Sequence, residues 1–419
     1  MKVYIHNLGC KINQFDGGVL KDGLIASGLE VVSGGEAADV YVINTCTVTK
    51  KSDYHCRQAI RRAVEKKGEG GMVVVTGCYA QTNSDEIKAI PGVDVVVGND
   101  ARDKLRDIIL KSARHDDADE NGILSAQGFG GRSRAYLKVQ DGCGTMCSYC
   151  IVPYARGASM SAQVEDVLDK AGSLIEKGYH EIVLTGVHLG AYGRDLGGGT
   201  GITALVRRLL ELPGLGRLRL SSIEPMEIDE GLMELAGSGK LCRHFHVPLQ
   251  SAVDKVLESM GRGYTSGEYF NIMAALSKRV NDPCLGADVI VGYPTEDRDS
   301  FEETVKKIGD SPINYLHVFS YSPRPGTRAY AMGDPVRGDE KKERSLILRE
   351  LATKKNMAFR SKFVGDTMTV VLEDNGRETS GLTDNYIRVR FDGSGSKPGS
   401  AVDVSILEAQ NDFCTGVVV

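Results

Sequence analysis

Residues 135–157, AYLKVQDGCGTMCSYCIVPYARG, join a short apolar run to a loop that holds three cysteines, Cys143, Cys147 and Cys150. A structural zinc site closes with four protein ligands, commonly as two pairs, and no second pair or nearby histidine completes this one. Thiolates are the normal ligands of iron-sulfur clusters, and closely spaced cysteines in a glycine-containing loop can wrap a cubane. Three thiolates leave one iron with an open position. The loop therefore predicts a cluster with room for a further ligand.

The stretch also begins a series of alternating strands and helices. Helical patterns separate the β-rich runs, whose sequences are AYLKVQ, EIVLTG, LRLSSIE, HFHVPLQ, GADVIVGYP and LHVFSYS. Six strand-helix units predict an open, partial (βα)6 barrel of the TIM type. The chemistry of such a barrel lies at the carboxyl ends of its strands.

The N-terminal part predicts a second α/β unit, a doubly wound parallel sheet. Its β-rich runs are KVYIHNLG, DVYVINT, GMVVVTG and VDVVVG, with helical patterns between them. Cys10, Cys46 and Cys78 follow the first three of these runs. Because the carboxyl ends of parallel strands share one edge, we expect these three thiols to converge there.

Composition changes mark the expected domain boundaries. We expect an N-terminal domain at 1–115, a polar, Gly-rich linker at 116–134 and the barrel at 135–360. Residues 361–419 carry short alternating runs and Gly/Asn/Asp turns, which predict a small all-β barrel.

Length and composition set further limits. A chain of 419 residues exceeds one ordinary core, and no apolar run approaches the roughly 18–20 residues that span a bilayer. We therefore expect a cytoplasmic protein without a membrane partner. Ten cysteines are too sparse for a disulfide scaffold and favour metal binding. A net charge of -5 does not indicate a general nucleic-acid binder, so any such partner must bind to local patches.

Several motifs carry a family resemblance. The Cys-x3-Cys-x2-Cys loop, with Tyr149 before its last cysteine, resembles the radical S-adenosylmethionine (SAM) family. GCK, NTCTVT, TGCYAQ, YCIVPYARG, LTGVHLGAYGRDL, RLSSIEP, HVPLQS and DVIVGYP resemble the methylthiotransferases in order along nearly the whole chain. Those enzymes combine an N-terminal domain, a radical SAM barrel and a C-terminal TRAM barrel.

The resemblance implies two 4Fe-4S clusters, one held by Cys10, Cys46 and Cys78 and one by Cys143, Cys147 and Cys150. It also implies two uses of SAM, as methyl donor and as source of the radical that removes hydrogen from an unreactive C–H bond. A low-potential electron donor and a sulfur source are further implied partners. We expect the chain to act as a monomer.

The stretch TVTKKSDYHCRQAIRRA after Cys46 is similar to enzymes that modify C2 of N6-threonylcarbamoyladenosine (t6A) at position 37 of tRNA. Other branches act on isopentenyladenosine in tRNA or on an aspartate of a ribosomal protein. A different class also stays open: a non-enzymatic iron-sulfur protein that binds RNA or senses redox state.

Candidate SAM contacts lie where barrel strands end. The residues are Thr185, His188, Ser222, Glu224, Gln250, Ser251, Val291 and Gly292. His188 is equally well read as a structural histidine. The isolated Cys56, Cys242, Cys284 and Cys414 are interpreted as small core residues.

Two segments are candidates for binding the tRNA anticodon stem-loop. Residues 50–67 hold seven basic and two acidic side chains, a net +5, and include Arg57, Arg61 and Arg62. An exposed helix face is the alternative. From Ser361 onward, five basic and nine acidic residues give a net -4. Tyr386, Arg388 and Arg390 could still form a strip on one strand face, or an ordinary solvent-facing strand.

Overall fold

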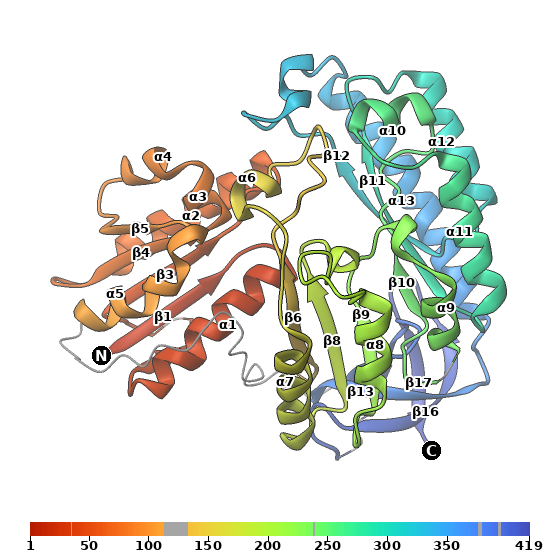
Figure 1. The fold of residues 1–419 in the computed structure, drawn as a ribbon, viewed down its shortest axis with the longest axis horizontal. Helices are drawn as coiled ribbons and strands as arrows, with labels where there is room; N and C mark the ends of the chain where they lie inside the picture. Colours follow the sequence, from red (N-terminus) through yellow and green to blue (C-terminus); the bar gives the residue numbers. More distant parts are fainter. Residues whose placement is uncertain (35, 113–132, 238, 376–378, 393–394) are drawn as a thin grey trace. The chain divides into compact units, whose positions relative to one another are not determined.

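The computed structural model describes residues 1–419 except 35, 113–132, 238, 376–378 and 393–394 (Figure 1). The described residues group into two compact units. The first draws on Met1–Phe129, Asp141–Met160 and Ser322–Thr327, and the second on Gly130–Gln140, Ser161–Tyr321 and Arg328–Val419. Most of the expected linker, up to residue 132, lies outside the described residues.

The first unit contains a five-stranded parallel sheet in the order β2-β1-β3-β4-β5. Its strands are β1 (Lys2–Asn7), β2 (Glu30–Val32), β3 (Val40–Thr45), β4 (Met72–Gly77) and β5 (Val95–Val97). All six residues of β3 are buried, as expected for a central strand covered on both faces.

Helices cover both faces of this sheet. They are α1 (Lys11–Ala26), α2 (Lys50–Lys66), α3 (Cys78–Thr82), α4 (Ser84–Lys88), η1 (Asn99–Lys104) and α5 (Leu105–Ser112), while α6 (Val152–Arg156) contacts α3 and η1. Alternate β3 residues enter two separate cores: Tyr41 and Ile43 pack with α2, whereas Val40 and Val42 pack with α1 and α5. The doubly wound parallel sheet is therefore confirmed.

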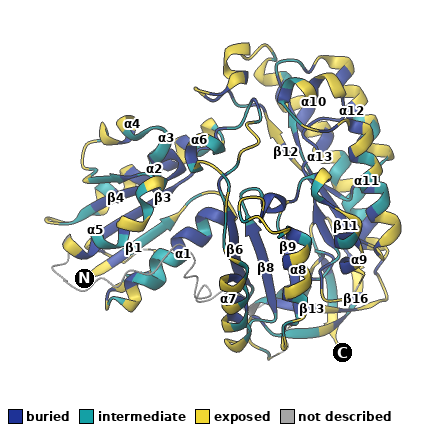
Figure 2. Ribbon diagram, viewed as in Figure 1, coloured by how far each residue is buried: buried dark blue, intermediate teal, exposed yellow. Residues whose placement is uncertain are grey.

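The second unit contains two sheets of mainly parallel strands. One has the order β7-β6-β8-β9 and the other β10-β11-β12, and a parallel bridge joins Leu218 to Leu241 between them. The strands are β6 (Ala135–Asp141), β7 (Met160–Ser161), β8 (Glu181–Gly186), β9 (Arg217–Leu220), β10 (His244–His246), β11 (Cys284–Val291) and β12 (Tyr315–Ser320). Figure 2 shows β6 and β8 almost entirely buried.

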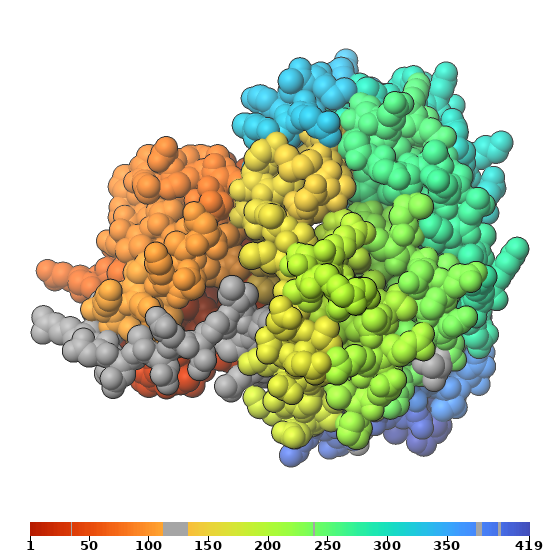
Figure 3. Space-filling model, in the orientation of Figure 1, coloured from red at the N-terminus to blue at the C-terminus, as the bar shows by residue number. Residues whose placement is uncertain are grey.

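A helix or short turn follows most of these strands. The elements are α7 (Val164–Glu176), η2 (Leu189–Ala191), α8 (Ile202–Leu210), η3 (Pro225–Glu227), α9 (Glu230–Ala236), α10 (Asp254–Met260), α11 (Ser266–Arg279), α12 (Arg298–Asp310), η4 (Arg328–Met332) and α13 (Gly338–Ser361). One apolar core joins the inner faces of η2 and of helices α7 to α13 to the strands. In the space-filling view the yellow-green segment that includes α7 and α8 forms a nearly continuous surface, because side chains fill the gaps between the ribbons (Figure 3). None of the described helices combines the length and hydropathy needed to cross a membrane.

The C-terminal segment forms a closed five-stranded barrel in the order β13-β14-β15-β17-β16, as the turn pattern predicts. Its strands are β13 (Thr367–Asn375), β14 (Thr379–Thr383), β15 (Arg388–Phe391), β16 (Ala401–Ala409) and β17 (Cys414–Val418). Within the second unit, Arg217 and Arg219 donate to the carbonyl oxygens of Leu382 and Thr383 at 2.7 and 2.9 Å. Both arginines also pair with buried Glu181; burial would raise the pKa of Glu181, but the arginines hold it well below its usual range.

Candidate functional site

The first thiol group (Cys10, Cys46 and Cys78) lies at the carboxyl ends of β1, β3 and β4, which are adjacent in the sheet. Cys46 directly follows β3, Cys78 directly follows β4, and Cys10 is the N-cap of α1. Gly9 has φ +96°, and a Cβ there would lie 2.6 Å from Cys46 Sγ. The turn before Cys10 therefore approaches Cys46 so closely that only glycine fits. The predicted convergence at one sheet edge is confirmed.

The surroundings of the first thiol group fit a thiolate-bound cluster. Burial, together with the neighbouring Cys10 and Cys78, raises the pKa of Cys46 to about 11, so three thiolates need compensating positive charge. Among the described residues, these sulfurs do not form a group whose ligand atoms all lie within 4.8 Å of one another. Asn99 Nδ2 donates to Cys78 Sγ at 3.6 Å, a contact of the kind that tunes a cluster's potential.

Cys56 supports the first thiol group from α2. The Cys46 N–H donates to Cys56 Sγ at 3.3 Å, and the Cys56 thiol donates to the Cys46 carbonyl at 3.2 Å. Burial raises the pKa of Cys56 to about 12, which keeps it a protonated thiol. Cys56 therefore orients Cys46. It and the other isolated cysteines, Cys242, Cys284 and Cys414, are all buried, as the core interpretation predicts.

The second thiol group (Cys143, Cys147 and Cys150) lies in the loop between β6 and α6. A Cβ at Gly142, where φ is +73°, would lie 1.9 Å from the Ala158 carbonyl oxygen, so the two ends of the loop touch. The Cys143 N–H donates to the Gly157 carbonyl at 3.1 Å and closes the loop. All three cysteines are partly exposed. The loop thus presents three thiols that a bound cluster can reach.

Arg156 connects this loop to the N-terminal sheet within the first unit. Its Nη2 lies 2.7 Å from Asn13 Oδ1 and 2.9 Å from Asp16 Oδ2, and its Nη1 lies 2.9 Å from Asp141 Oδ1. Burial would lower the pKa of Arg156, but Cys78, Asp16 and Asp141 raise it well above its usual value. Arg156 belongs to α6, which follows the second thiol group, but its buried positive charge lies beside the first thiol group. Sequence reasoning missed Arg156; its only signal was a charge in a short apolar helix after Cys150.

Arg324 supports the first thiol group from another part of the chain. It donates to Asp53 Oδ2 and Thr47 Oγ1, both at 2.6 Å, and Thr47 donates to Asp53 Oδ1 at 2.7 Å. Thr47 directly follows Cys46, so the buried arginine fixes the turn that carries this cysteine. No sequence signal indicated this contact between segments 271 residues apart.

The structure brings His188 and Glu224, two of the SAM candidates, into one polar cluster in the second unit. His188 Nε2 lies 2.7 Å from Glu227 Oε1, and the backbone N–H of His188 donates to Gln140 Oε1 at 2.7 Å. Burial raises the pKa of Glu224, although Arg262, its ion-pair partner, and His188 oppose the shift. Sequence reasoning missed Gln140, Glu227 and Arg262, which hold the two candidates.

The remaining candidates differ in what they can offer to a ligand. Ser222 is exposed, whereas the buried Thr185 hydroxyl donates to the Leu137 carbonyl at 3.4 Å and Ser251 is buried beside the Val253 N–H. Gln250 has φ +67° and forms an isolated bridge to Val289.

The end of β11 offers mainly backbone. The Val291 side chain is buried in the apolar core, and a Cβ at Gly292 would lie 2.5 Å from Lys341 Cγ. The Gly292 N–H donates to Glu296, whose pKa is raised to about 7 by burial, despite the opposing Gly292 N–H and Arg344.

The basic segment at 50–67 comprises α2 and its C-cap residue Lys67, and its arginines differ in exposure. Arg57 donates to Tyr79 Oη at 2.7 Å and pairs with Glu86 at 3.0 Å. Arg61 and Arg62 are exposed.

The proposed strip on one C-terminal strand face is wrong for Tyr386. This residue precedes β15, has φ +67° and stacks on His244 with ring centroids 4.0 Å apart. The turn breaks the alternation that would have placed Tyr386 beside Arg388. On β15 itself, Arg388 pairs with Glu373 at 2.8 Å, and the Arg390 guanidinium lies 3.9 Å from the Phe413 ring centroid.

Comparisons with known proteins agree with this geometry. The family described as "Uncharacterized protein family UPF0004" matches residues 2–98, and the radical SAM superfamily matches residues 137–308. A radical SAM methyltransferase from Kitasatospora setae, TsrM, has a similar fold, with a TM-score of 0.56 at 16% identity over 78% of this chain and 77% of that one.

Two curated relatives extend along most of the chain. The threonylcarbamoyladenosine tRNA methylthiotransferase MtaB of Bacillus subtilis is 38% identical over 99% of this chain and 95% of its own length. The tRNA-2-methylthio-N(6)-dimethylallyladenosine synthase of Zymomonas mobilis is 32% identical over 90% of this chain and 86% of its own length. With both thiol groups in place and similarity along its full length, the chain belongs to the radical SAM methylthiotransferase family.

Proposed function

We propose that this protein methylthiolates C2 of t6A at position 37 of tRNA, consuming two molecules of SAM. The observation that carries the proposal is the near full-length similarity to the Bacillus subtilis enzyme, whose name gives that substrate. The Zymomonas relative, named for dimethylallyladenosine, is less similar at 32% identity.

Two 4Fe-4S clusters are part of the proposal, one on each thiol group. When bound, the clusters and SAM supply a methyl group by displacement and a 5′-deoxyadenosyl radical that removes hydrogen from C2 of adenine. Cys56 and Arg324 orient Cys46, and Arg156 places a buried positive charge beside Cys78 and Cys10. That charge offsets part of the negative charge of the thiolates.

The six strands β6 and β8–β12 are proposed to form the partial TIM-type barrel, with a TRAM-like barrel at 361–419 and the N-terminal domain at 1–115. The parallel bridge between Leu218 and Leu241, which continues β9 toward β10, supports one six-stranded array. His188 and Glu224 follow the carboxyl ends of β8 and β9. Glu227 and Arg262 hold these two side chains in place, and we propose that His188 and Glu224 bind the amino acid or ribose part of SAM.

The exposed Arg61 and Arg62 of α2 are proposed to contact phosphates of the tRNA anticodon stem-loop. The helix begins four residues after Cys46, which suits a nucleotide modified near the first thiol group. A low-potential electron donor and a sulfur source complete the partners, and we propose a cytoplasmic monomer.

Mass spectrometry of tRNA nucleosides tests the substrate. A strain that lacks its own t6A methylthiotransferase should gain ms2t6A when it expresses this gene. A gain of methylthio-isopentenyladenosine instead would move the enzyme to the other tRNA branch, and a modified ribosomal protein with unmodified tRNA would move it to the third.

Chemical activity tests the enzyme class. After anaerobic reconstitution and reduction with SAM present, the protein should release 5′-deoxyadenosine. A non-enzymatic iron-sulfur protein would release none.

A further inference from the structure

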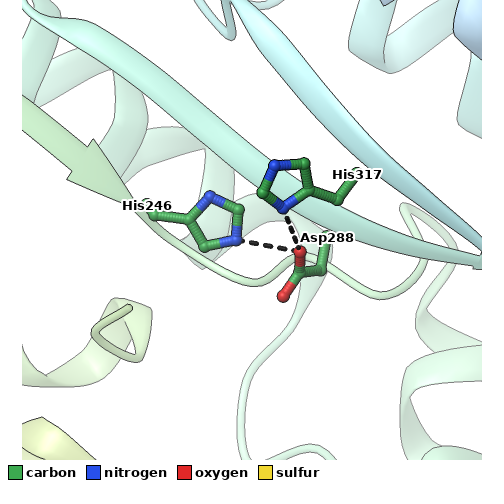
Figure 4. A group of neighbouring side chains, drawn as sticks. All are labelled: His246, Asp288 and His317. Atoms are coloured by element: carbon green, nitrogen blue, oxygen red, sulfur yellow. Dashed lines mark hydrogen bonds and ion pairs between the residues drawn. The ribbon is translucent and has the colours of Figure 1, made fainter. Parts of the chain in front are cut away.

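A second candidate metal site lies away from the cysteines, in the second unit. His246 on β10, Asp288 on β11 and His317 on β12 point toward one another (Figure 4). Asp288 Oδ1 lies 2.9 Å from His246 Nε2 and 3.2 Å from His317 Nδ1. The three ligand atoms all lie within 4.8 Å of one another, and no other group of this kind occurs among the described residues.

Strand alternation determines which way these side chains face. Their neighbours in sequence Val247, Val289 and Val318 belong to the apolar core that packs against the helices. Because side chains alternate along a strand, the two histidines and Asp288 lie on the opposite face of the sheet. Three strands therefore hold three ligands, two imidazoles and one carboxylate, on one face of the sheet.

Tyr315 contacts the ring nitrogen of His246 that does not face Asp288. Its Oη lies 2.9 Å from His246 Nδ1 and 2.8 Å from His244 Nε2. When Tyr315 donates its single proton to His244, His246 must donate from Nδ1, which leaves a lone pair on Nε2 beside the Asp288 carboxylate. In this tautomer the Nε2 lone pair and the carboxylate oxygen, 2.9 Å apart, can share one cation; in the other tautomer Nε2–H donates to Asp288, and a metal ion would take the place of that proton. A partner on the outer nitrogen is also what metal-ligating histidines usually have.

We propose that His246, Asp288 and His317 bind one Zn²⁺ ion. Two imidazoles and one carboxylate suit this ion, and three protein ligands leave a position open for water. The carboxylate offsets half of the ion's charge. This ligand set has no sulfur, so the site differs in chemistry from both thiol groups.

The site is open to solvent on one side. His246 is buried, whereas the His317 side chain is 54% exposed. His317 also lines a cavity of about 240 Å³ together with Tyr315, Arg360 and Arg388. An ion can therefore enter from the His317 side.

Zinc loading of the reconstituted, cluster-containing protein tests the site. The protein is incubated anaerobically with Zn²⁺, excess metal is removed by gel filtration, and zinc and iron are measured by mass spectrometry. We expect about one zinc per chain, bound only by nitrogen and oxygen in X-ray absorption spectra. The variants His317→Ala and Asp288→Asn should each lose most of this zinc while they keep their iron.

The matched control is His55→Ala, which removes an exposed histidine from α2 and should keep its zinc. The retained iron of the two site variants shows that they are folded, and His317 is exposed enough to be replaced without a cavity. Absence of zinc from the parent protein would overturn the proposal. Sulfur in the zinc coordination shell, or equal zinc in parent and site variants, would overturn it too.

Discussion

The two thiol groups present the same three ligands but are built in different ways. The second group needs eight consecutive positions, from Cys143 to Cys150, and a loop closed by the Cys143–Gly157 hydrogen bond. The first group needs a whole sheet, because its cysteines follow three different strands. The first group therefore depends on long-range packing, whereas the second depends mainly on its own loop.

Removing each thiol group in turn should separate their functions and give the largest effects. Changing Cys143, Cys147 and Cys150 to Ala should abolish release of 5′-deoxyadenosine and formation of ms2t6A. Changing Cys10, Cys46 and Cys78 to Ala should abolish ms2t6A but leave 5′-deoxyadenosine, since the second group is intact. Each triple variant should lose about four of about eight irons per chain.

Iron analysis can contradict this division directly. A loss of fewer than about two irons from the Cys10/Cys46/Cys78 variant would mean that the first thiol group holds no four-iron cluster. Loss of 5′-deoxyadenosine from both variants would mean that the two groups do not act separately.

The difference between the groups also explains how much of the molecule was predictable. The second cysteine set follows from local spacing, and the first follows from its position after three β-rich runs. The doubly wound sheet and the C-terminal β-barrel follow from hydrophobic periodicity, so all four could be predicted from the sequence. Arg324 pairs with Asp53 across 271 residues, and Arg156 meets Asn13 across 143 residues, and neither partner has a local signal. Tyr386 was misplaced because its positive φ interrupts an otherwise regular strand pattern.

A backbone change should harm the first thiol group more than an equivalent change in the loop. Gly9→Ala forces a side chain at φ +96° against Cys46, with a Cβ contact of 2.4 Å to Cys46 Cβ. The conformation alone costs about 1–2 kcal/mol, and the overlap must move Cys46 as well. We expect about half of the iron and nearly all ms2t6A activity to disappear, with 5′-deoxyadenosine still released.

Gly144→Ala, in the loop of the second group, is the matched control. A Cβ there meets nothing within 4 Å, so this variant should keep all of its iron. Full iron in Gly9→Ala would show that the Cys10 turn tolerates a shift and would weaken the contrast between the groups.

Arg156 tests whether the loop is as independent as its sequence suggests. Arg156→Met leaves Asp16 and Asp141 with one fewer cationic partner in a buried site, although Arg102 still pairs with Asp16 at 2.7 Å. We expect the free energy of unfolding to fall by about 3 kcal/mol, measured by anaerobic urea denaturation.

Arg298→Met is the control for removal of a surface charge. Its side chain is 84% exposed and pairs with Glu302 one helical turn away, an interaction worth only about 0.3–0.5 kcal/mol. Equal destabilisation by the two changes would show that Arg156 contributes no more than a surface ion pair.

The arginines that follow the two thiol groups differ in burial, and this difference gives the smallest expected effect, on tRNA binding. Arg156, after the second group, is buried in ion pairs, whereas Arg61 and Arg62, after the first group, are exposed. Only the exposed Arg61 and Arg62 can contact phosphates, so tRNA binding should depend on α2.

Changing Arg61 and Arg62 to Ala should weaken tRNA binding several-fold. It should also lower the slope of log K against log salt by roughly 0.7–0.9 for each phosphate that the protein no longer neutralises. Changing Lys278 and Arg279 of α11 to Ala removes the same exposed charge elsewhere and should leave the slope unchanged. An equal change of slope in both double variants would mean that tRNA responds to net charge alone, and α2 would then be an ordinary solvated helix face.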